Sequence, residues 1–594
     1  MRVWLAVAAA VLVYANALPN PYLWDDVDQL ERNHALSVSS NAAKLFSGRY
    51  YDIAREESYR PVKLATFFAT APLLGLGAPA QRAVNAGLHA ANTYLVYGLA
   101  AAWVGAGAAL PAALLFAVHP VHAEAVNCVS YRDELLACLF LLLALLALER
   151  RRPKAALAAF ALALLSKENA IVLPLLVLGK RFIAPDETRK DEQKTFLLGA
   201  FALAGGYLVL RFLVLPNPEQ QAVYQGGNFL TNLLTMSQAA AGYARLLVWP
   251  SFLSVSYDVP ALTSPFDRRF LLSFGLLAGL AAAAWKLRER SKLGAFLAFW
   301  TAASLLPVLN LVPFLLYSLV FERYLYIPSV GFCLLAGLAL SQLPRRVFLP
   351  LTAVIFCAFA WRTTGRNADW RDAESLYGPV LKAYPNHFAT YVTLGRSRMD
   401  KGNLDGAIPL FQKSLELAPA YYSAHNALGA VLFKKGEKAA ALEHFQKALD
   451  IRPGYVEAWN NLAVARFESG HAHLAEVAVR EALALKPHDL NSHENLTLFL
   501  MRQGKAEEAV QTANAALALG LRSPSLYAYL GMALSRKGLA EQAIPQFQAA
   551  LAMAPDDPAL HDYLGVTYAS LRRDDDAVAE FEKALAHKPD YTPA

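Results

Sequence analysis

Residues 422–455 read YSAHNALGAVLFKKGEKAAALEHFQKALDIRPGY, and a unit of this length recurs throughout the C-terminal part of the chain. The period is marked by prolines at 385, 419, 453, 487, 555 and 589, by glycines at 402, 436, 470, 504 and 538, and by alanines at 407, 441, 475, 509, 543 and 577. A proline ends a helix, and a small residue admits a close crossing of two helices. Each unit therefore predicts a pair of helices, with Ala441 at a close crossing and Pro453 at the end of the second helix.

A 34-residue period with small residues at fixed points is typical of the tetratricopeptide repeat, or TPR. Six repeats can be counted, enough to bury a shared core, so residues 366–594 predict a TPR α-solenoid. Leu521 stands where the period requires proline, and Pro524 follows it, so we expect an altered turn there. The concave groove of such an array usually binds a peptide; the alternative use is as a spacer or an oligomerisation surface.

The apolar composition of residues 1–365 predicts a second domain, which is embedded in a membrane. Hydrophobic residues make up 56% of the chain, the mean hydropathy is +0.29, and the apolar excess lies before residue 362. A bilayer must solvate part of such a chain. Apolar runs occupy 3–18, 83–103, 106–118, 133–148, 155–165, 169–179, 195–215, 268–285, 294–309, 324–342 and 347–361. We expect an all-α fold with a polytopic bundle of about eleven spans, in which runs shorter than roughly 20 residues are broken or shielded helices.

Positive charge predicts how these spans are oriented. Short loops rich in lysine and arginine lie at 149–154, 180–194, 286–292 and 344–346. The positive-inside rule makes them cytoplasmic. The first run ends in Ala15-Asn16-Ala17, which fits a cleavable leader, but the many later spans favour an uncleaved anchor. Alternation then puts 19–80, 119–132, 216–267 and everything after Trp361 outside, in a bacterial periplasm or, in a eukaryote, the lumen of the endoplasmic reticulum.

The charge balance excludes one class of partner. The net charge of +7 comes from short blocks between apolar runs rather than from a basic face interleaved with aromatic residues. We therefore expect no nucleic-acid partner. All four cysteines lie in or beside apolar runs, and no CxxC or Cys/His spacing indicates zinc.

The first external loop carries adjacent carboxylates, Asp25 and Asp26, just after the first apolar run. A carboxylate desolvated beside another acquires a raised pKa and can act as a general base. We favour Asp26 slightly over Asp25 for that role. The alternative is an ordinary hydrated loop or a helix N-cap.

Other polar clusters fall on the same predicted face. They are His119, His122 and Glu124; Arg132, Asp133 and Glu134; Lys167 and Glu168; and Glu322 and Arg323. The first cluster has the residue types of a zinc site, but histidines there are more often hydrogen-bonded packing residues, and we expect no metal. Lys167 and Arg323 can pair with a phosphate. The alternative is a topology charge or an ion pair with Glu168 or Glu322.

Taken together, these segments resemble a known family. The motifs are, in order, Trp24-Asp25-Asp26, Ser58-Tyr59-Arg60-Pro61, residues 116–126 (FAVHPVHAEAV), Arg132-Asp133, Ser166-Lys167-Glu168 and residues 322–329 (ERYLYIPS), with a TPR array after them. This order is similar to that of the TMTC family, the transmembrane and tetratricopeptide-repeat proteins, and of their bacterial relatives. The chain departs from the family pattern in Asp133-Glu134, where an apolar residue should follow the aspartate, and in Asn169 after Lys-Glu.

The resemblance implies a GT-C glycosyltransferase related to protein O-mannosyltransferases. Such an enzyme moves a sugar, here expected to be mannose, from a polyprenyl-phosphate carrier to a protein hydroxyl and needs no further cofactor. Asp25 and Asp26 would supply the base, and Lys167, Arg323 and Arg132 would bind the donor phosphate. The supporting residues would be Arg60, His119, His122, Glu124, Asp133, Glu168 and Glu322. The TPR groove would recruit the acceptor, and membrane lipids would surround the spans.

Two other functions fit parts of the sequence. One is a membrane-anchored TPR scaffold for protein assembly without catalysis, although a single span suffices for an anchor. The other is a transporter or ligase of lipid-linked sugars that uses Lys167 and Arg323 for the same phosphate. Loss of turnover in a folded Asp25/Asp26 double alanine variant separates a transferase from a scaffold.

Overall fold

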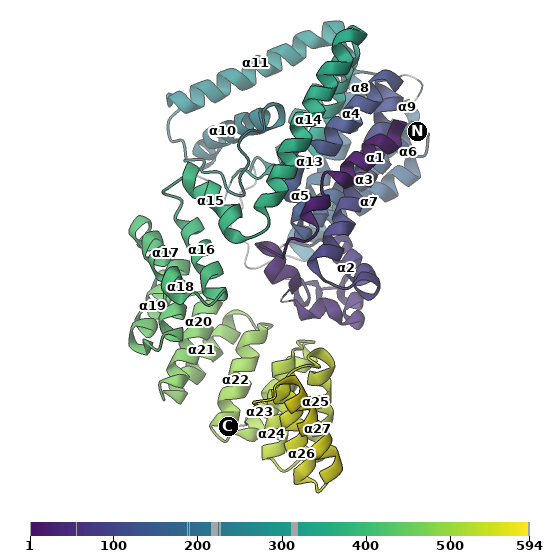
Figure 1. The fold of residues 1–594 in the computed structure, drawn as a ribbon. Helices are drawn as coiled ribbons and strands as arrows, with labels where there is room; N and C mark the ends of the chain where they lie inside the picture. Colours follow the sequence, from purple (N-terminus) through teal and green to yellow (C-terminus); the bar gives the residue numbers. More distant parts are fainter. Residues whose placement is uncertain are drawn as a thin grey trace. The chain divides into compact units, whose positions relative to one another are not determined.

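The computed structural model describes residues 2–31, 33–54, 56, 58–186, 188, 190–214, 224, 227–310 and 319–591. Every regular element within these ranges is a helix, which agrees with the predicted all-α class (Figure 1). The chain divides into two compact units, Met1–Pro385 and Asn386–Ala594. This division falls later in the chain than the domain boundary expected at residue 365, which lies inside a long helix.

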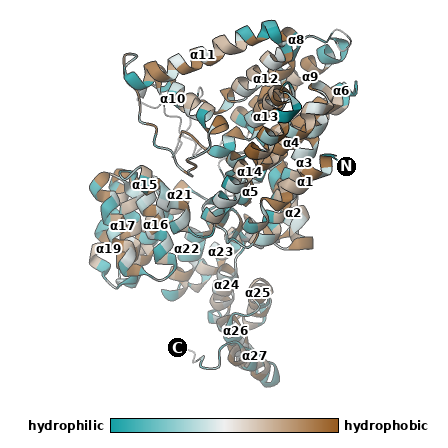
Figure 2. Ribbon diagram, turned by 45° about the horizontal axis from the view of Figure 1, so that its top comes forward, coloured by the Kyte–Doolittle hydropathy of each residue, from teal (hydrophilic) through white to brown (hydrophobic). Residues whose placement is uncertain are grey.

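Unit 1 is a bundle of helices of very different lengths. Its α-helices are α1 (Arg2–Leu12), α2 (Pro61–Leu74), α3 (Ala78–Trp103), α4 (Ala106–Val118), α5 (Ala123–Asn127), α6 (Arg132–Glu149), α7 (Pro153–Ser166), α8 (Leu173–Ile183), α9 (Lys190–Val209), α10 (Phe229–Val248), α11 (Arg268–Arg290), α12 (Lys292–Ala303), α13 (Tyr326–Ser341), α14 (Arg345–Asp369) and α15 (Ala373–Ala383). The largest apolar core is built around Phe116, Phe160, Trp300 and Tyr326. Hydrophobic residues dominate helices such as α4 and α13 in Figure 2.

The prediction of about eleven spans is wrong for the described residues. Four helices there are long and apolar enough to cross a membrane: Lys190–Val214, Arg268–Arg290, Glu322–Ser341 and Arg345–Asp369. A bent pair, Ala106–Val118 with Pro120–Asn127, makes a fifth if it counts as one span.

Length and buried polarity explain the difference. The runs at 155–165 and 169–179 are α7, of 14 residues, and α8, of 11 residues, separated at Lys167 by an extended backbone. A 14-residue helix is only about 21 Å long, against the ~30 Å of a hydrocarbon core. Helix α3 is longer, but it buries polar side chains, among them Gln81, Asn85 and His89. Apolar runs in the sequence thus include helices that pack inside the protein.

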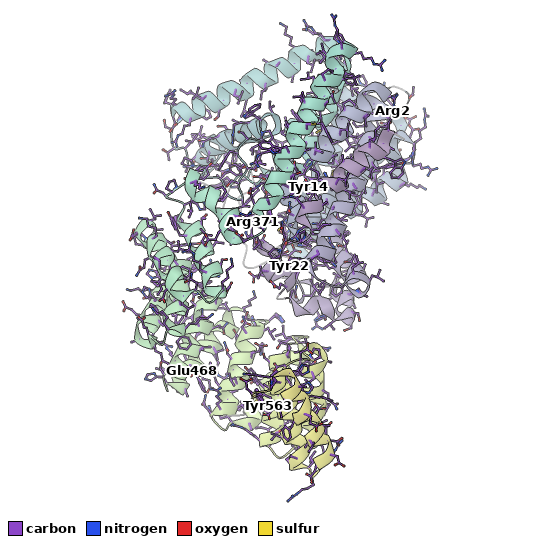
Figure 3. The ribbon with its side chains drawn as sticks, viewed as in Figure 1. Arg2, Tyr14, Tyr22, Arg371, Glu468 and Tyr563 are labelled. Atoms are coloured by element: carbon purple, nitrogen blue, oxygen red, sulfur yellow. The ribbon has the colours of Figure 1, made fainter. Side chains whose placement is uncertain are left out.

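Unit 2 consists, over its described residues, of six successive helix pairs, α16 to α27. The helices are α16 (Phe388–Asp400), α17 (Leu404–Leu417), α18 (Tyr422–Lys434), α19 (Lys438–Ile451), α20 (Val456–Glu468), α21 (Ala472–Leu485), α22 (Leu490–Arg502), α23 (Ala506–Ala518), α24 (Pro524–Arg536), α25 (Ala540–Met553), α26 (Pro558–Ser570) and α27 (Asp574–His587). Figure 3 labels Glu468, the last residue of α20, and Tyr563 in α26. The predicted solenoid is therefore present, with one helical hairpin for each 34-residue period.

Glycine and alanine occupy the close helix crossings, as the period predicts. A Cβ added to Gly429 would lie 2.8 Å from the Phe445 ring and 3.1 Å from the Ala441 carbonyl. The altered turn expected near Leu521 is also observed. Helix α23 ends at Ala518, Gly520 has a φ of +82°, and Pro524 opens α24, where a proline needs no backbone donor.

Candidate active site

The Trp24-Asp25-Asp26 turn has a strained backbone. Trp24 has a φ of +58°, a left-handed conformation that costs a non-glycine residue about 1–2 kcal/mol. Its ring stacks on Trp370 with centroids 6.5 Å apart and lies edge-on to Tyr131 at 5.9 Å. Phe321 and Tyr377 pack on the same ring at 6.2 and 6.4 Å. Four aromatic contacts from distant segments therefore hold a backbone conformation that the local sequence disfavours.

Asp26 acts as an internal brace. It is 1% exposed, and its carboxylate accepts the backbone N–H groups of Val129 at 2.9 Å and Ser130 at 2.6 Å. The Cys128 thiol donates a third bond, at 3.3 Å. Burial raises the pKa of Asp26, and the Ser130 and Val129 amides oppose that rise. With both oxygens committed to one loop, Asp26 has no free face for an acceptor.

Asp25 points to different surroundings. It is half-buried, and its Oδ2 accepts the Tyr131 hydroxyl at 2.7 Å. Among the described residues, its Oδ1 accepts no hydrogen bond. The guanidinium of Arg323 lies 4.1 Å from the centroid of the same Tyr131 ring. Asp25 is therefore the carboxylate of the pair that has both a free oxygen and a nearby cation.

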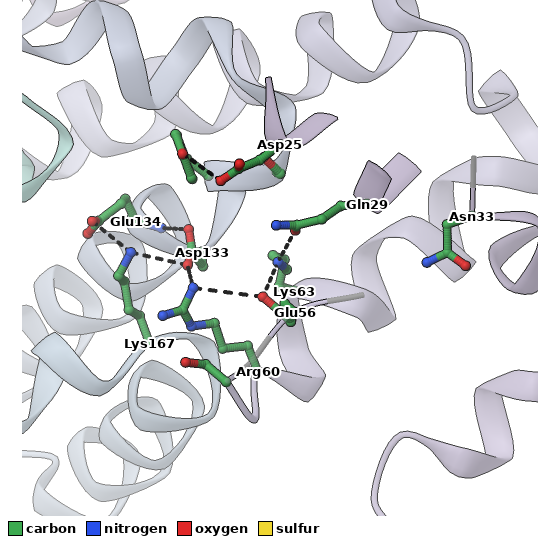
Figure 4. Close-up of polar contacts among 12 residues, drawn as sticks. Asp25, Gln29, Asn33, Glu56, Arg60, Lys63, Asp133, Glu134 and Lys167 are labelled. Atoms are coloured by element: carbon green, nitrogen blue, oxygen red, sulfur yellow. Dashed lines mark hydrogen bonds and ion pairs between the residues drawn. The ribbon is translucent and has the colours of Figure 1, made fainter. Parts of the chain in front are cut away.

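A network of ion pairs joins four of the predicted site residues, and Figure 4 labels three of them, Arg60, Asp133 and Lys167. Arg60, just before the first turn of α2, bonds Asp133 Oδ2 at 2.6 Å and Glu168 Oε1 at 2.7 Å. Lys167, on the extended link after α7, bonds Asp133 at 3.2 Å and Glu134 at 2.8 Å. Both acids lie in the first turn of α6, where the helix dipole favours negative charge. The alternative of an ion pair between Lys167 and Glu168 is thus replaced by pairs with Asp133 and Glu134.

The network continues toward the first loop. Lys63 bonds both Glu56 and Gln29, and Glu56 also lies 3.8 Å from Arg60. Burial alone would raise the pKa of Asp133, but the charges of Lys167 and Arg60 outweigh it and lower that pKa below the usual range. Lys167 and Arg60 therefore favour the ionised form of Asp133, whereas burial raises the pKa of Glu134 to about 7.

Arg323 is paired with Glu124 rather than with its neighbour Glu322. Its guanidinium bonds Glu124 Oε1, and its backbone N–H bonds Glu124 Oε2 at 2.9 Å. The guanidinium also lies 3.8 Å from the centroid of the Phe321 ring. Glu322 turns instead to Arg366 at 3.4 Å. The alternative of an ion pair between Arg323 and Glu322 is thus replaced by a pair with Glu124, because successive residues of a short helix point in different directions.

Arg132 occupies a separate, neutral pocket. It is fully buried, and it donates to Asn85 Oδ1 at 2.8 Å, Thr66 Oγ1 at 3.2 Å and the Gln81 carbonyl at 2.9 Å. Its guanidinium stacks on Phe67 at 4.3 Å. Since its donors are satisfied inside the bundle, we do not assign it to the donor phosphate.

The two histidines of the first cluster are packing residues. His119 Nε2 contacts the Leu247 carbonyl at 3.0 Å, and His122 Nε2 contacts Ser329 Oγ at 2.8 Å. Glu124 faces Arg323 and not the rings. Among the described residues, no group of three His, Cys, Asp or Glu side chains is arranged to hold a metal ion.

Arg82 is a buried residue that the sequence reasoning missed. Its guanidinium donates to the carbonyls of Asn20, Pro21 and Asn127, at 2.5, 3.0 and 2.9 Å. It therefore ties the segment that leads into Trp24 to the segment that Asp26 braces. Its position as a lone cation at the edge of the apolar run 83–103 is the signal that could have identified it.

An apolar cavity of about 690 Å³ lies between α7 and α9. Its lining residues are Leu157, Ala158, Ala161, Leu164, Leu165, Gly199, Ala202, Leu203, Gly206, Tyr207 and Leu210. Leu165 lies two positions before Lys167 in the chain, so the cavity and the ion network share the C-terminal end of α7. Tyr22, labelled in Figure 3, lies two residues before Trp24, in the loop that carries Asp25 and Asp26.

Comparisons with known proteins identify relatives of both units. Residues 370–591 match the family model of the cilia and flagella-associated protein 70 C-terminal domain. The chain is 25% identical over 422 residues to protein O-mannosyl-transferase F38B6.6 of Caenorhabditis elegans, covering 67% of this chain and 60% of that protein. It is 26% identical to protein O-mannosyl-transferase TMTC3 of Mus musculus, covering 69% and 50%.

These relatives confirm the resemblance to the TMTC family that the motifs predicted. The chain spans between half and three-fifths of their length. Among solved structures, a Pseudomonas aeruginosa PilF structure shares 21% identity at a TM-score of 0.31, covering 34% of this chain and 93% of that one. A tetratricopeptide repeat protein from Parabacteroides merdae shares 17% identity at a TM-score of 0.32, covering 40% and 92%.

Proposed function

We propose that this chain is a membrane glycosyltransferase that moves a sugar from a polyprenyl-phosphate donor to a hydroxyl of an acceptor protein. The observation that carries the proposal is the Asp25 carboxylate, with one oxygen free, beside Tyr131 and Arg323. The names of the relatives favour mannose as the sugar. Multiple spans, with the site and the TPR array on the extracytoplasmic side, belong to the same proposal.

The reaction needs one base and one or two cations. The acceptor oxygen attacks the anomeric carbon, the bond from that carbon to the phosphate oxygen breaks, and the electron pair leaves with the lipid phosphate. The acceptor proton passes to a carboxylate. A phosphate leaving group needs no proton donor, only positive charge where its own charge develops. In-line attack inverts the anomeric centre, so base and phosphate lie on opposite faces of the sugar.

Asp25 is the better base of the two aspartates. Asp26 gives its oxygens to the Val129 and Ser130 amides, and a proton on it would break those bonds. Asp25 uses one oxygen for Tyr131. This reverses the slight preference for Asp26 that the sequence alone supported.

Arg323 and Lys167 are the donor-phosphate residues that fit the geometry best. Arg323 carries five N–H donors, and its recorded bond to Glu124 leaves several for an incoming phosphate. Lys167 has its charge held in place by Asp133 and Glu134, with room for a third partner on its three donors. Phosphate binding at either residue adds to an existing ion pair, which keeps the cation oriented before the donor arrives.

The cavity between α7 and α9 suits the lipid portion of such a donor. It is lined by aliphatic side chains, glycines and a tyrosine, and α9 belongs to a helix long and apolar enough to cross a membrane. An isoprenoid chain would enter the cavity from the bilayer, so van der Waals packing against the lining, and not removal from water, would hold the chain there. The end of α7 then leads directly to Lys167.

The TPR array is proposed to recruit the acceptor. Helices α18, α20 and α22 carry a row of amides: Asn461 donates to Asn426 at 2.9 Å, and Asn495 donates to Asn460 at 3.3 Å. Asn426 and Asn460 are buried, whereas Asn461 and Asn495 are partly exposed. Partly exposed amides can hydrogen-bond the backbone of an extended peptide. Capture by the array raises the local concentration of acceptor hydroxyls.

The test is transfer of labelled sugar from polyprenyl-phosphate mannose to a Ser/Thr-rich peptide pool by the purified full-length protein. Arg323→Ala removes a charge-assisted bond of about 1.5–3 kcal/mol, so the KM for the donor should rise about 10- to 150-fold. Arg371→Ala, an exposed arginine after α14, is the matched control and should leave that KM unchanged. Absence of transfer from any polyprenyl-phosphate sugar, by protein that elutes as a single species, contradicts the transferase and leaves the scaffold.

A further inference from the structure

The residues that hold Trp24 come partly from a segment beyond the last long apolar helix. Trp370 directly follows α14, is 1% exposed, and stacks on Trp24 with ring planes 26° apart. Tyr377 lies in α15, is 6% exposed, and meets the Trp24 ring at 69°. The sequence had placed both residues in the repeat domain, yet both belong to unit 1.

Their contact with Trp24 bears on the direction of Asp25. A left-handed backbone at a tryptophan persists only where the surroundings enforce it. Asp25 is the next residue, and Asp26 is fixed to the 128–130 segment on its other side. The Trp24 ring and the Asp26 carboxylate are therefore two anchors, and the Asp25 carboxylate projects from the short turn between them.

We propose that Trp370 and Tyr377 are positioning residues that act through Trp24 to aim the Asp25 carboxylate at the acceptor hydroxyl. The inference rests on the proposed role of Asp25 as the base. It extends the functional part of the chain past residue 365 into α15, which a boundary drawn at the composition change would exclude.

Variants of Trp370 and Tyr377 distinguish positioning of Asp25 from phosphate binding better than variants of the other two residues that pack on Trp24. Tyr131 and Phe321 also stack on the Arg323 guanidinium, at 4.1 and 3.8 Å, so their loss would disturb the cation as well. Trp370 and Tyr377 are not among the aromatic rings that stack on Arg323 in the described structure. The Trp24 ring itself lies 5.7 Å from the Arg323 guanidinium, farther than the rings of Phe321 and Tyr131. A change at Trp370 or Tyr377 should therefore lower turnover more than it weakens use of the donor.

The experiment compares Tyr377→Ala with a matched control in the full-length protein. Tyr384 caps the same helix and pairs with Phe252 at 6.2 Å, so Tyr384→Ala removes an equal side chain from α15 without touching Trp24. We expect Tyr377→Ala to lower kcat about 10- to 100-fold, because a misplacement of about 1 Å has that effect on a reacting group. The donor KM should change less than kcat, because Trp24 is farther from the Arg323 guanidinium than Phe321 and Tyr131 are. Tyr377→Phe should restore most of kcat, and Tyr384→Ala should keep it.

A double-mutant cycle tests whether the effect passes through Trp24. Tyr377→Ala should cause no further loss in a Trp24→Ala background, since the two changes break one interaction. If the kcat losses of Tyr377→Ala and Trp24→Ala multiply in the double variant, the inference is wrong. It is also wrong if Tyr377→Ala and Tyr384→Ala have equal kcat values.

A readout independent of activity keeps the inference separate from the proposed function. If Asp25→Asn transfers sugar at the wild-type rate, the role of Asp25 fails. The positioning of Trp24 is then tested by ¹⁹F NMR of protein labelled with 5-fluorotryptophan, with the Trp24 resonance assigned from its absence in Trp24→Phe. That resonance should move in Tyr377→Ala and not in Tyr384→Ala, and an unmoved resonance contradicts the contact.

Discussion

Asp25 and Asp26 are adjacent in sequence, but the structure predicts that asparagine at position 25 lowers the transfer rate and asparagine at position 26 lowers stability. Asp25 is half-buried and accepts one hydroxyl, from Tyr131. Asp25→Asn keeps that acceptor and the shape of the side chain but cannot take a proton. We expect the unfolding midpoint to stay unchanged and the transfer rate to fall about 100- to 10,000-fold, the usual loss when a general base is removed.

Asp26→Asn should instead reduce stability. The carboxylate meets the Val129 and Ser130 amides at 2.9 and 2.6 Å. An asparagine turns one N–H group of its own toward one of these amides, leaving a buried donor unpaired at a cost of about 1–3 kcal/mol. Unit 1 ends at Pro385, and a unit of this size has an unfolding entropy of about 0.8 kcal/mol/K, so each kcal/mol lowers the unfolding midpoint by about 1 °C.

The assay measures sugar transferred per folded enzyme molecule, with the unfolding midpoint of the same preparation. Glu31→Gln, at an exposed glutamate that ends the short helix after Asp26, is the control for a lost charge and should change neither quantity. A stable Asp26→Asn protein without transfer, beside an active Asp25→Asn protein, would show that we have exchanged the two roles. If both variants and the double variant transfer at the wild-type rate, the general-base mechanism is wrong.

Three further predictions concern the repeats and their placement. Ala475 is fully buried in α21, so Ala475→Leu should lower the free energy of unfolding by about 1–3 kcal/mol in denaturant melts. Val477→Leu, on the exposed side of that helix, should leave it unchanged, and equal effects of the two variants would contradict the helix packing. In a Cys357→Ala background, a Ser469→Cys protein should react with a membrane-impermeant thiol reagent added outside intact cells, and labelling only after permeabilisation would place the array inside. Burial and a neighbouring histidine lower the pKa of His444, so the unfolded chain binds the proton first as the pH falls below about 6.5. Stability should therefore drop from pH 7 to pH 5, and His444→Gln should drop less; an equal drop would show that another group is responsible.

The sequence by itself determined the repeat unit and marked several polar segments that the fold brings together. A helix pair of the solenoid contacts mainly its neighbours, so glycine, alanine and proline at a fixed period specify each hairpin and its packing locally. The motifs around Asp25, Arg60, Lys167 and Arg323 also marked segments that the fold brings near one another. These segments could be recognised because charged side chains beside apolar runs are energetically costly unless they form ion pairs or bind a ligand.

Only the tertiary structure decided which partner each of these groups has. An apolar run does not record whether lipid or protein covers it, so about eleven expected spans became four in the described residues, or five with the bent pair. Adjacent residues on an irregular turn point in unrelated directions. The roles of Asp25 and Asp26 could therefore be distinguished only from the backbone conformation at Trp24. Trp370 and Tyr377 reach Trp24 across more than three hundred residues, and Arg82 fixes the same loop through backbone carbonyls. Such contacts depend on how helices pack in three dimensions, and no local spacing in the sequence encodes them.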